Sequence, residues 1–210
     1  MNIAVPLDDM RGDALPSISE AGPAPKRIVA AYGFWIFLLS DIVMFAALFA
    51  GYAVLVNATA GGPAGAALFN KITVAIETAC LLASSYTCGL MSLAINARRR
   101  GTTYLWALVT FLLGAGFLAL EIREFANMIA SGAGPQRSAF LSAFFTLVGC
   151  HGLHVTGGLV WLAVMMAQVA ARGFRPAVER RLRCFSLFWH ALDIIWVGLF
   201  SVVYLMGVTQ

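Results

Sequence analysis

Long apolar blocks alternate with short polar segments along most of the chain. The five blocks cover approximately residues 32–56, 72–95, 103–120, 140–170 and 184–207. A helix needs about 20 residues to cross the hydrocarbon core of a bilayer; the third block is near the lower limit and the others exceed it. Lipid offers backbone amides no hydrogen-bond partner, so such segments are helical. The pattern predicts an all-α fold, an integral membrane bundle of five transmembrane helices.

The segments between the blocks are short and contain helix-breaking residues. They are 57–63, 98–101, 131–135 and 172–176, and each includes glycine or proline. Short connections make consecutive helices antiparallel neighbours. Residues 1–31, rich in Pro, Ala and Gly and poor in aromatic residues, predict a disordered leader. Residues 32–207 are therefore expected to form one transmembrane domain.

Composition supports a membrane protein and excludes an ordinary soluble domain. The chain is 60% hydrophobic and 11% charged, whereas soluble domains carry about 25% charged residues. The net charge is +4, which raises the question of a nucleic-acid partner. The basic residues lie in short segments beside the apolar blocks and form no basic face, so we expect no nucleic-acid binding.

The distribution of Lys and Arg predicts the orientation of the chain. Basic residues on cytoplasmic segments outnumber those on the opposite side in most membrane proteins. Eleven of the 14 Lys and Arg fall on the side of the leader. The remaining three are Lys71, Arg123 and Arg137. We therefore expect a cytoplasmic N-terminus and a periplasmic C-terminus.

Seven ionisable side chains lie within or at the ends of the apolar blocks, where each costs about 2.5–3.5 kcal/mol at mid-helix. They are Asp41, Glu77, Glu121, His151, His154, His190 and Asp193. His151 and His154 are three residues apart, as are His190 and Asp193. Residues at this spacing share a helix face, so each pair is expected to point into the bundle together.

Two interpretations of these side chains remain open. Histidines gathered in a bundle core can bind a metal or haem, although the Glu-x-x-His motifs of di-metal bundles are absent. Alternatively, the histidines form structural hydrogen bonds. Asp41 and Asp193 should lie at similar depth, about 13 Å from the cytoplasmic side, with His154 a partner for either. Such a group is either a proton relay or a static polar clasp.

A cluster of opposite charges marks the expected outer end of the third block. Glu121, Arg123 and Glu124 follow the apolar run 103–120 directly. Opposite charges this close usually neutralise one another at a surface. We therefore expect a helix-end cluster at the membrane interface.

Three segments together resemble subunit III of the haem-copper terminal oxidases. They are 33–45 (GFWIFLLSDIVMF), 149–157 (GCHGLHVTG) and 188–196 (FWHALDIIW). Subunit III of cytochrome c oxidases typically has seven helices, whereas the bo-type ubiquinol oxidases resemble it with the first two missing. Segments 57–63 and 134–145 are also similar to the bo-type branch. Asp41 stands where cytochrome c oxidase subunit III commonly has glutamate, which favours the quinol branch.

The resemblance implies a non-catalytic accessory subunit of a proton-pumping ubiquinol oxidase in a bacterial plasma membrane. It implies that haem, copper and ubiquinol belong to subunit I and that this chain binds none of them. The implied partners are subunits I, II and IV and phospholipids. The implied roles are support of assembly and of proton uptake by subunit I. A subunit III-like protein of a cytochrome c oxidase or nitric-oxide reductase system is the alternative. An alternative of another class is a stand-alone membrane metalloenzyme or transporter using His151, His154 and His190.

Overall fold

The computed structural model describes residues 26–61 and 71–205, and these residues contain helices and no strand. The helices are α1 (Lys26–Leu55), α3 (Lys71–Asn96), α4 (Arg100–Ala130), α5 (Ala139–Arg172), α6 (Pro176–Leu199) and the short π-helix η2 (Phe200–Leu205). Five helices are long and apolar enough to cross a membrane. This confirms the predicted all-α class and the five spanning helices.

The helices extend beyond several of the predicted limits. Residues 1–25 of the predicted leader lie outside the described part of the chain. Residues 26–31 belong to α1, because residues 28–31 are Ile, Val and Ala and include no glycine or proline. Helix α4 continues past residue 120 to Ala130. Charged residues end an apolar run, but Glu and Arg are good helix formers and need not end the helix itself.

Helix α6 begins before its apolar block, and its first turn explains why. Pro176 occupies the first turn, where a missing amide hydrogen costs nothing. Glu179 lies in the same turn, where a negative charge is stabilised by the helix dipole. Arg180, Arg181 and Arg183, which precede the apolar block 184–207, are therefore helical.

The chain divides into two compact units, residues 1–37 and 38–210. In the first unit, the rings of Phe34 and Phe37 in α1 are 6.1 Å apart. The second unit contains the rest of α1 and the helices α3 to α6.

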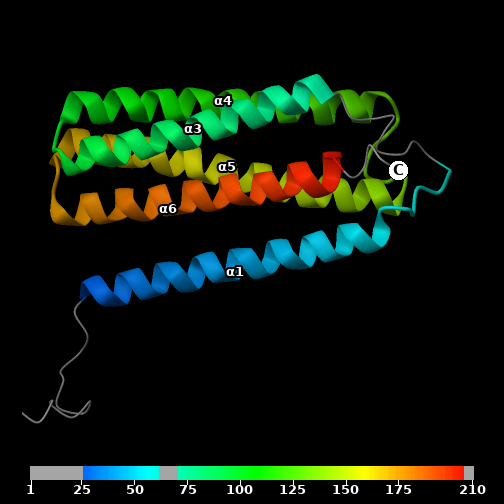
Figure 1. The fold of residues 1–210 in the computed structure, drawn as a ribbon, viewed down its shortest axis with the longest axis horizontal. Helices are drawn as coiled ribbons and strands as arrows, with labels where there is room; N and C mark the ends of the chain where they lie inside the picture. Colours follow the sequence, from blue (N-terminus) through cyan, green and yellow to red (C-terminus); the bar gives the residue numbers. More distant parts are fainter. Residues whose placement is uncertain (1–25, 62–70, 206–210) are drawn as a thin grey trace, which may run out of the picture. The chain divides into compact units, whose positions relative to one another are not determined.

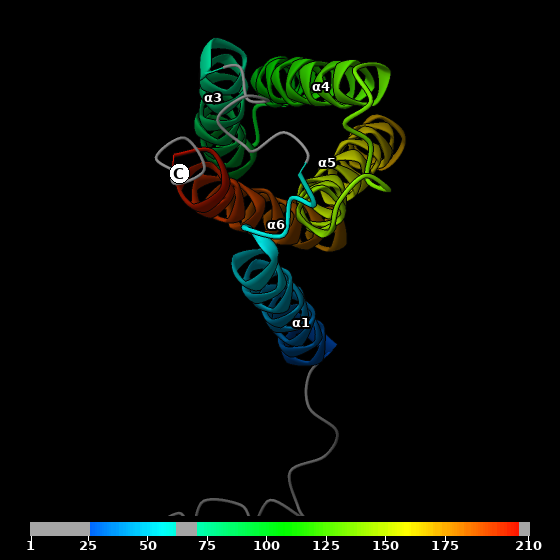
Figure 2. The ribbon, with the colours of Figure 1, turned by 90° about the vertical axis from the view of Figure 1, so that its right-hand side faces the viewer.

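Helices α3, α4, α5 and α6 form a four-sided bundle (Figures 1 and 2). Each of them packs against two others, with α3 and α5 each contacting α4 and α6. Large aromatic side chains fill the centre, and Phe117, Phe144, Phe185, Trp189 and Trp196 are almost completely buried. The core therefore consists of interlocking rings from α4, α5 and α6.

Hydrogen bonds between hydroxyl groups and indoles join α6 to α3. Trp189 Nε1 donates to Ser84 Oγ at 3.1 Å, and Trp196 Nε1 donates to Thr78 Oγ1 at 3.1 Å. Serine and threonine commonly connect helices in this way within a membrane, where water cannot satisfy a polar group. Both indole N–H groups are thus paired inside the bundle.

Candidate functional site

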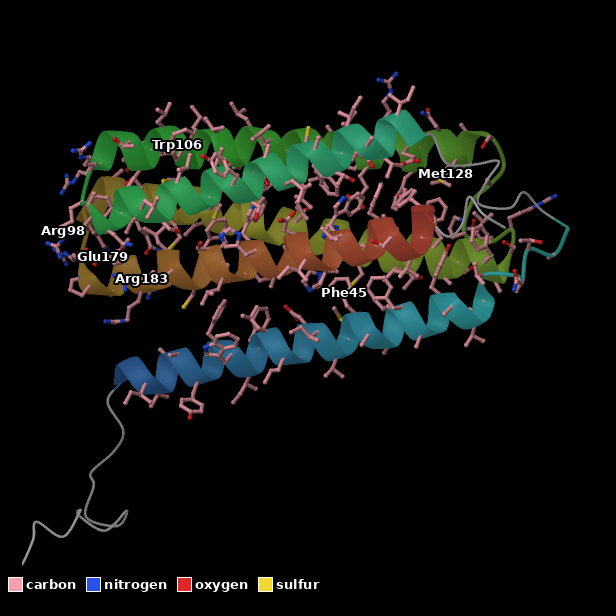
Figure 3. All side chains as sticks on the ribbon, in the orientation of Figure 1. Phe45, Arg98, Trp106, Met128, Glu179 and Arg183 are labelled. Atoms are coloured by element: carbon pink, nitrogen blue, oxygen red, sulfur yellow. The ribbon has the colours of Figure 1, made fainter. Side chains whose placement is uncertain are left out.

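Asp41 of α1 and His154 of α5 form an ion-pair contact. Their Oδ1 and Nε2 atoms are 3.9 Å apart, and the side chains are 14% and 21% exposed. His154 Nδ1 is 2.7 Å from the carbonyl oxygen of Cys150. A carbonyl only accepts, so Nδ1 carries a proton and Nε2 faces the carboxyl group. The edge of the Phe45 ring covers the imidazole at a centroid distance of 5.2 Å, and Figure 3 labels Phe45 on α1.

His151 is fully buried and connects α5 to α6. Its Nε2 donates to the carbonyl oxygen of Leu192 at 3.2 Å. The rings of Phe117 and Trp196 surround it at centroid distances of 5.7 and 5.2 Å. Its Nδ1 has no hydrogen-bond partner among the described residues. This environment is that of a structural histidine in an aromatic core.

His151 and His154 both lie against the Phe45 ring of α1 and both contact α6, but they have different bonding partners. His151 bonds to the Leu192 carbonyl of α6 and packs against Phe117 of α4, whereas His154 has Asp41 of α1 as its ion-pair partner. Side chains three residues apart on a helix point in directions that differ by about 60°, because three residues complete slightly less than one turn. That angle is enough to give the two imidazoles different bonding partners although both contact Phe45.

His190 and Asp193 of α6 lie beside Ser85 of α3. The Ser85 Oγ is 2.7 Å from His190 Nδ1, and all three side chains line a groove of about 540 Å³ between the two helices. The Asp193 carboxyl interacts with Ser85 and with His190. Asp41 and Asp193, expected to meet at one level, therefore each have a different imidazole as partner.

Glu77 of α3 and Glu121 of α4 form a second polar group inside the bundle. Both side chains are buried, and they interact electrostatically with one another and with Glu124. None of the four carboxylate oxygens of Glu77 and Glu121 has a hydrogen-bond partner among the described residues.

The predicted charge cluster at the outer end of the third block is not found. Glu121 faces the bundle, and a Cβ atom at Gly152 of α5 would lie 2.8 Å from its Oε1. Arg123 points outward and forms no ion pair with any described residue. The continuation of α4 to Ala130 places the two charges on opposite sides of one helix.

The described residues do not form a metal site. No group of three or more His, Cys, Asp or Glu side chains in residues 26–61 and 71–205 is placed to hold an ion. His151, His154 and His190 each bond to a different group, namely the Leu192 carbonyl, the Cys150 carbonyl and Ser85. These histidines therefore do not fit a shared metal or a haem.

Sequence reasoning missed the hydroxyl partners on α3. Ser84 accepts from Trp189, and Ser85 pairs with His190. The available signal was a pair of small polar residues in the middle of an apolar run, one turn before Gly89. Small residues at this spacing mark close helix contacts in membranes.

Comparison with known proteins identifies the family. The model of the family described as cytochrome c oxidase subunit III matches residues 25–208. The cytochrome bo(3) ubiquinol oxidase subunit 3 of Pseudomonas aeruginosa is 55% identical over 176 residues, 84% of each chain. The quinol oxidase subunit 3 of Bacillus subtilis is 46% identical, covering 83% of this chain and 86% of its own. The cytochrome c oxidase subunit 3 of Bacillus sp. PS3 is 44% identical, covering 95% and 97%.

The match extends over the whole described bundle. It includes Asp41 with its partner His154, and the groove residues His190 and Asp193. The long apolar helices and the aromatic core are those of a protein that crosses the membrane several times. The chain belongs to the cytochrome c oxidase subunit III family.

Proposed function

We propose that this chain is the non-catalytic subunit III of a proton-pumping, bo-type ubiquinol oxidase that reduces O2 to water. Family membership already makes it an accessory subunit III of a haem-copper oxidase, which works with other oxidase subunits in a bacterial inner membrane. The observation that carries the quinol assignment is its higher identity to the ubiquinol oxidase relative than to the cytochrome c oxidase relative. Asp41 in place of the glutamate supports the same branch.

The structure supports an accessory role. The intramembrane histidines form separate hydrogen bonds and provide no common centre for a metal within the described residues. We assign haem, copper and ubiquinol to subunit I. Subunits I, II and IV and phospholipids are the proposed partners, and support of assembly and of proton uptake by subunit I is the proposed contribution.

We propose a cytoplasmic N-terminus and a periplasmic C-terminus. In the second unit, Arg98, Glu179 and Arg183 lie at the same end of the bundle (Figure 3). This end collects the arginines between α3 and α4 and those between α5 and α6. The positive-inside rule favours the cytoplasm for such an end. Reporters fused after residues 97 and 133 should show opposite sides of the membrane, and a periplasmic reporter at residue 97 would reverse the assignment.

Purification of the intact complex through a tag on this chain tests the function. We expect sister subunits with haem and copper to copurify, and the complex to consume O2 with ubiquinol-1 and not with reduced cytochrome c. Activity with cytochrome c alone would establish the alternative oxidase type. Oxidation of neither donor, with nitric oxide reduced instead, would indicate a reductase system.

Metal analysis of the chain separated from its partners tests the alternative of another class. We expect less than about one metal in ten chains, because the described histidines have separate partners. One tightly bound metal per chain, lost on replacement of His151 or His190, would support a stand-alone metalloenzyme instead.

A further inference from the structure

Three glutamates lie together inside the bundle, toward the end opposite to Arg98. They are Glu77 of α3 and Glu121 and Glu124 of α4, and each interacts electrostatically with the other two. Glu77 is completely buried and Glu121 is nearly so. Figure 3 labels Met128, one turn after Glu124, at the end of the bundle away from Arg98. The three carboxyl groups therefore share one region of the interior.

Five oxygen atoms of these glutamates have no hydrogen-bond partner among the described residues. They are both carboxyl oxygens of Glu77, both of Glu121, and Oε1 of Glu124, and all five are shielded from solvent. A buried polar atom is costly unless it is paired, so proteins pair such atoms with their own groups or with ordered water. The region therefore requires additional hydrogen-bond donors.

Two tyrosine hydroxyls reach the same region from other helices. Tyr204 of the π-helix η2 is buried, and it interacts electrostatically with all three glutamates and with Tyr52 of α1. The hydroxyl of Tyr52 is shielded from solvent and has no hydrogen-bond partner among the described residues. A hydroxyl can both donate and accept a hydrogen bond. Helices α1 and η2 thus add potential donors to the carboxyl groups of α3 and α4.

The described part of the chain offers these glutamates no ion-pair partner. Neither ion pair between described residues includes one of them. On α5, the backbone of Gly152 faces Glu121, and the next side chain, His151, bonds to α6. On α6, the neutral indole of Trp196 packs against Tyr204 at a centroid distance of 6.2 Å. No positive charge in these residues is therefore paired with the three carboxyl groups.

Three ionised carboxyl groups are unfavourable in such a place. Each charge loses its hydration on burial, and like charges repel more strongly in a low-dielectric interior than in water. Carboxyl groups that share a site without a cation therefore retain a proton. A protonated carboxyl group is also a donor, and a buried water molecule makes about three hydrogen bonds to groups that are otherwise unpaired. A proton and water together can satisfy the buried oxygens.

We propose that Glu77, Glu121 and Glu124 form an internal proton-binding site, in which at least one carboxyl group stays protonated at neutral pH and buried water links them to the two tyrosine hydroxyls. In the binding step, a carboxylate oxygen takes up one proton and becomes a neutral carboxylic acid. The ligands of the site are therefore a proton and water. The site does not involve Asp41 or His154, and it does not depend on which electron donor the oxidase uses.

Infrared difference spectra of the purified complex test for the bound proton. A glutamate in water ionises at about pH 4.3, so a carboxylic acid that persists at neutral pH marks a site of this kind. The test variant replaces Glu77, Glu121 and Glu124 with glutamine, which keeps the shape of a neutral carboxylic acid. The spectrum of the wild type minus that of this variant should contain the C=O stretching band of about one carboxylic acid or more per chain. The band should shift when H2O is replaced by D2O.

Glu179→Gln is the matched control for this measurement. The carboxylate of Glu179 already has the guanidinium of Arg98 as its partner, at 3.4 Å. Its difference spectrum should show the loss of carboxylate bands and no carboxylic acid band. Absence of a carboxylic acid band from the spectrum of the triple variant, at full assembly of the complex, would overturn the proposal.

Tyr52→Phe tests the link to the tyrosine hydroxyls. The carboxylic acid band should remain and change in frequency, because the hydrogen bonding around the carboxyl groups changes. Tyr86→Phe is the control, since Tyr86 lies on α3 with its side chain 70% exposed, and this variant should leave the band unchanged. An identical band in wild type and Tyr52→Phe would contradict the link.

A cryo-EM map of the wild-type complex that resolves water tests the proposal without any variant, and so remains decisive if the triple variant fails to assemble. At least one water should lie at hydrogen-bond distance, about 2.7–3.2 Å, from a carboxyl oxygen of Glu77 or Glu121. An arginine or lysine of a sister subunit bonded to these oxygens would overturn the proposal, and so would a metal ion in their place.

Discussion

The six-membered ring of Trp189 on α6 lies directly against the backbone of Gly158 on α5. A Cβ atom at residue 158 would stand 2.8 Å from Cζ3 of the indole. The same ring lies 2.9 Å from the corresponding position at Gly114 of α4, and its Nε1 donates to Ser84 of α3. One side chain therefore contacts the three other helices of the four-sided bundle.

Gly158→Ala should destabilise the bundle, because the indole is buried and has no room to move away. We expect the free energy of unfolding in detergent to fall by about 1–3 kcal/mol, the usual cost of overpacking a core. Gly157→Ala is the neighbouring control, and no atom lies within 4 Å of its added methyl group. This control should be neutral or stabilising by up to about 1 kcal/mol. A loss of equal size in both variants would contradict the close contact with Trp189.

Ser84→Ala should leave the indole N–H of Trp189 without its acceptor. An unsatisfied donor in an apolar interior is unfavourable, so we expect a loss of about 1 kcal/mol in unfolding free energy. Ser201→Ala is the control, because its exposed hydroxyl bonds only to the carbonyl of Val197 in the preceding turn. Tryptophan fluorescence during unfolding would measure both. A neutral Ser84→Ala would show that another acceptor replaces the hydroxyl.

Asp41→Asn distinguishes a static clasp from a proton relay. The 3.9 Å separation exceeds hydrogen-bond distance, and the Nδ1 of His154 is already bonded to a backbone carbonyl. We therefore expect the assembled complex to take up protons at the same rate as the wild type. Stopped-flow measurements with a pH indicator would test this. Slower proton uptake at full assembly would favour the relay instead.

Glu179→Gln should change stability by less than about 1 kcal/mol. Glu179 Oε1 is 3.4 Å from the Arg98 guanidinium, but the Arg98 side chain is 68% exposed, and exposed ion pairs contribute little. The difference from the wild type should disappear in about 1 M salt, where the Debye length is about 3 Å. A large effect that persists in high salt would mean that Glu179 has a role beyond this pair.

The helices could be predicted from the sequence, because each contains an apolar block long enough to cross the bilayer. Helices α1 and α5 are examples. Their ends were less predictable. Hydropathy indicates where a segment leaves the lipid, but a helix can continue beyond that point. The end of α4 at Ala130 depends on where the chain must turn. The family could also be predicted from short sequence motifs, such as those around Asp41 and His190, because such a motif is recognised from the order of its residues without knowledge of the fold.

The sequence by itself determined that the chain is a five-helix membrane protein with ionisable side chains in its spans. Only the tertiary structure decided their partners: His154 with Asp41, His151 with the Leu192 carbonyl, and His190 with Ser85. The physical reason is that residues three apart differ in direction by about 60°. Which neighbour each side chain meets therefore depends on the packing of helices distant in sequence, and spacing along one helix carries no information about that packing.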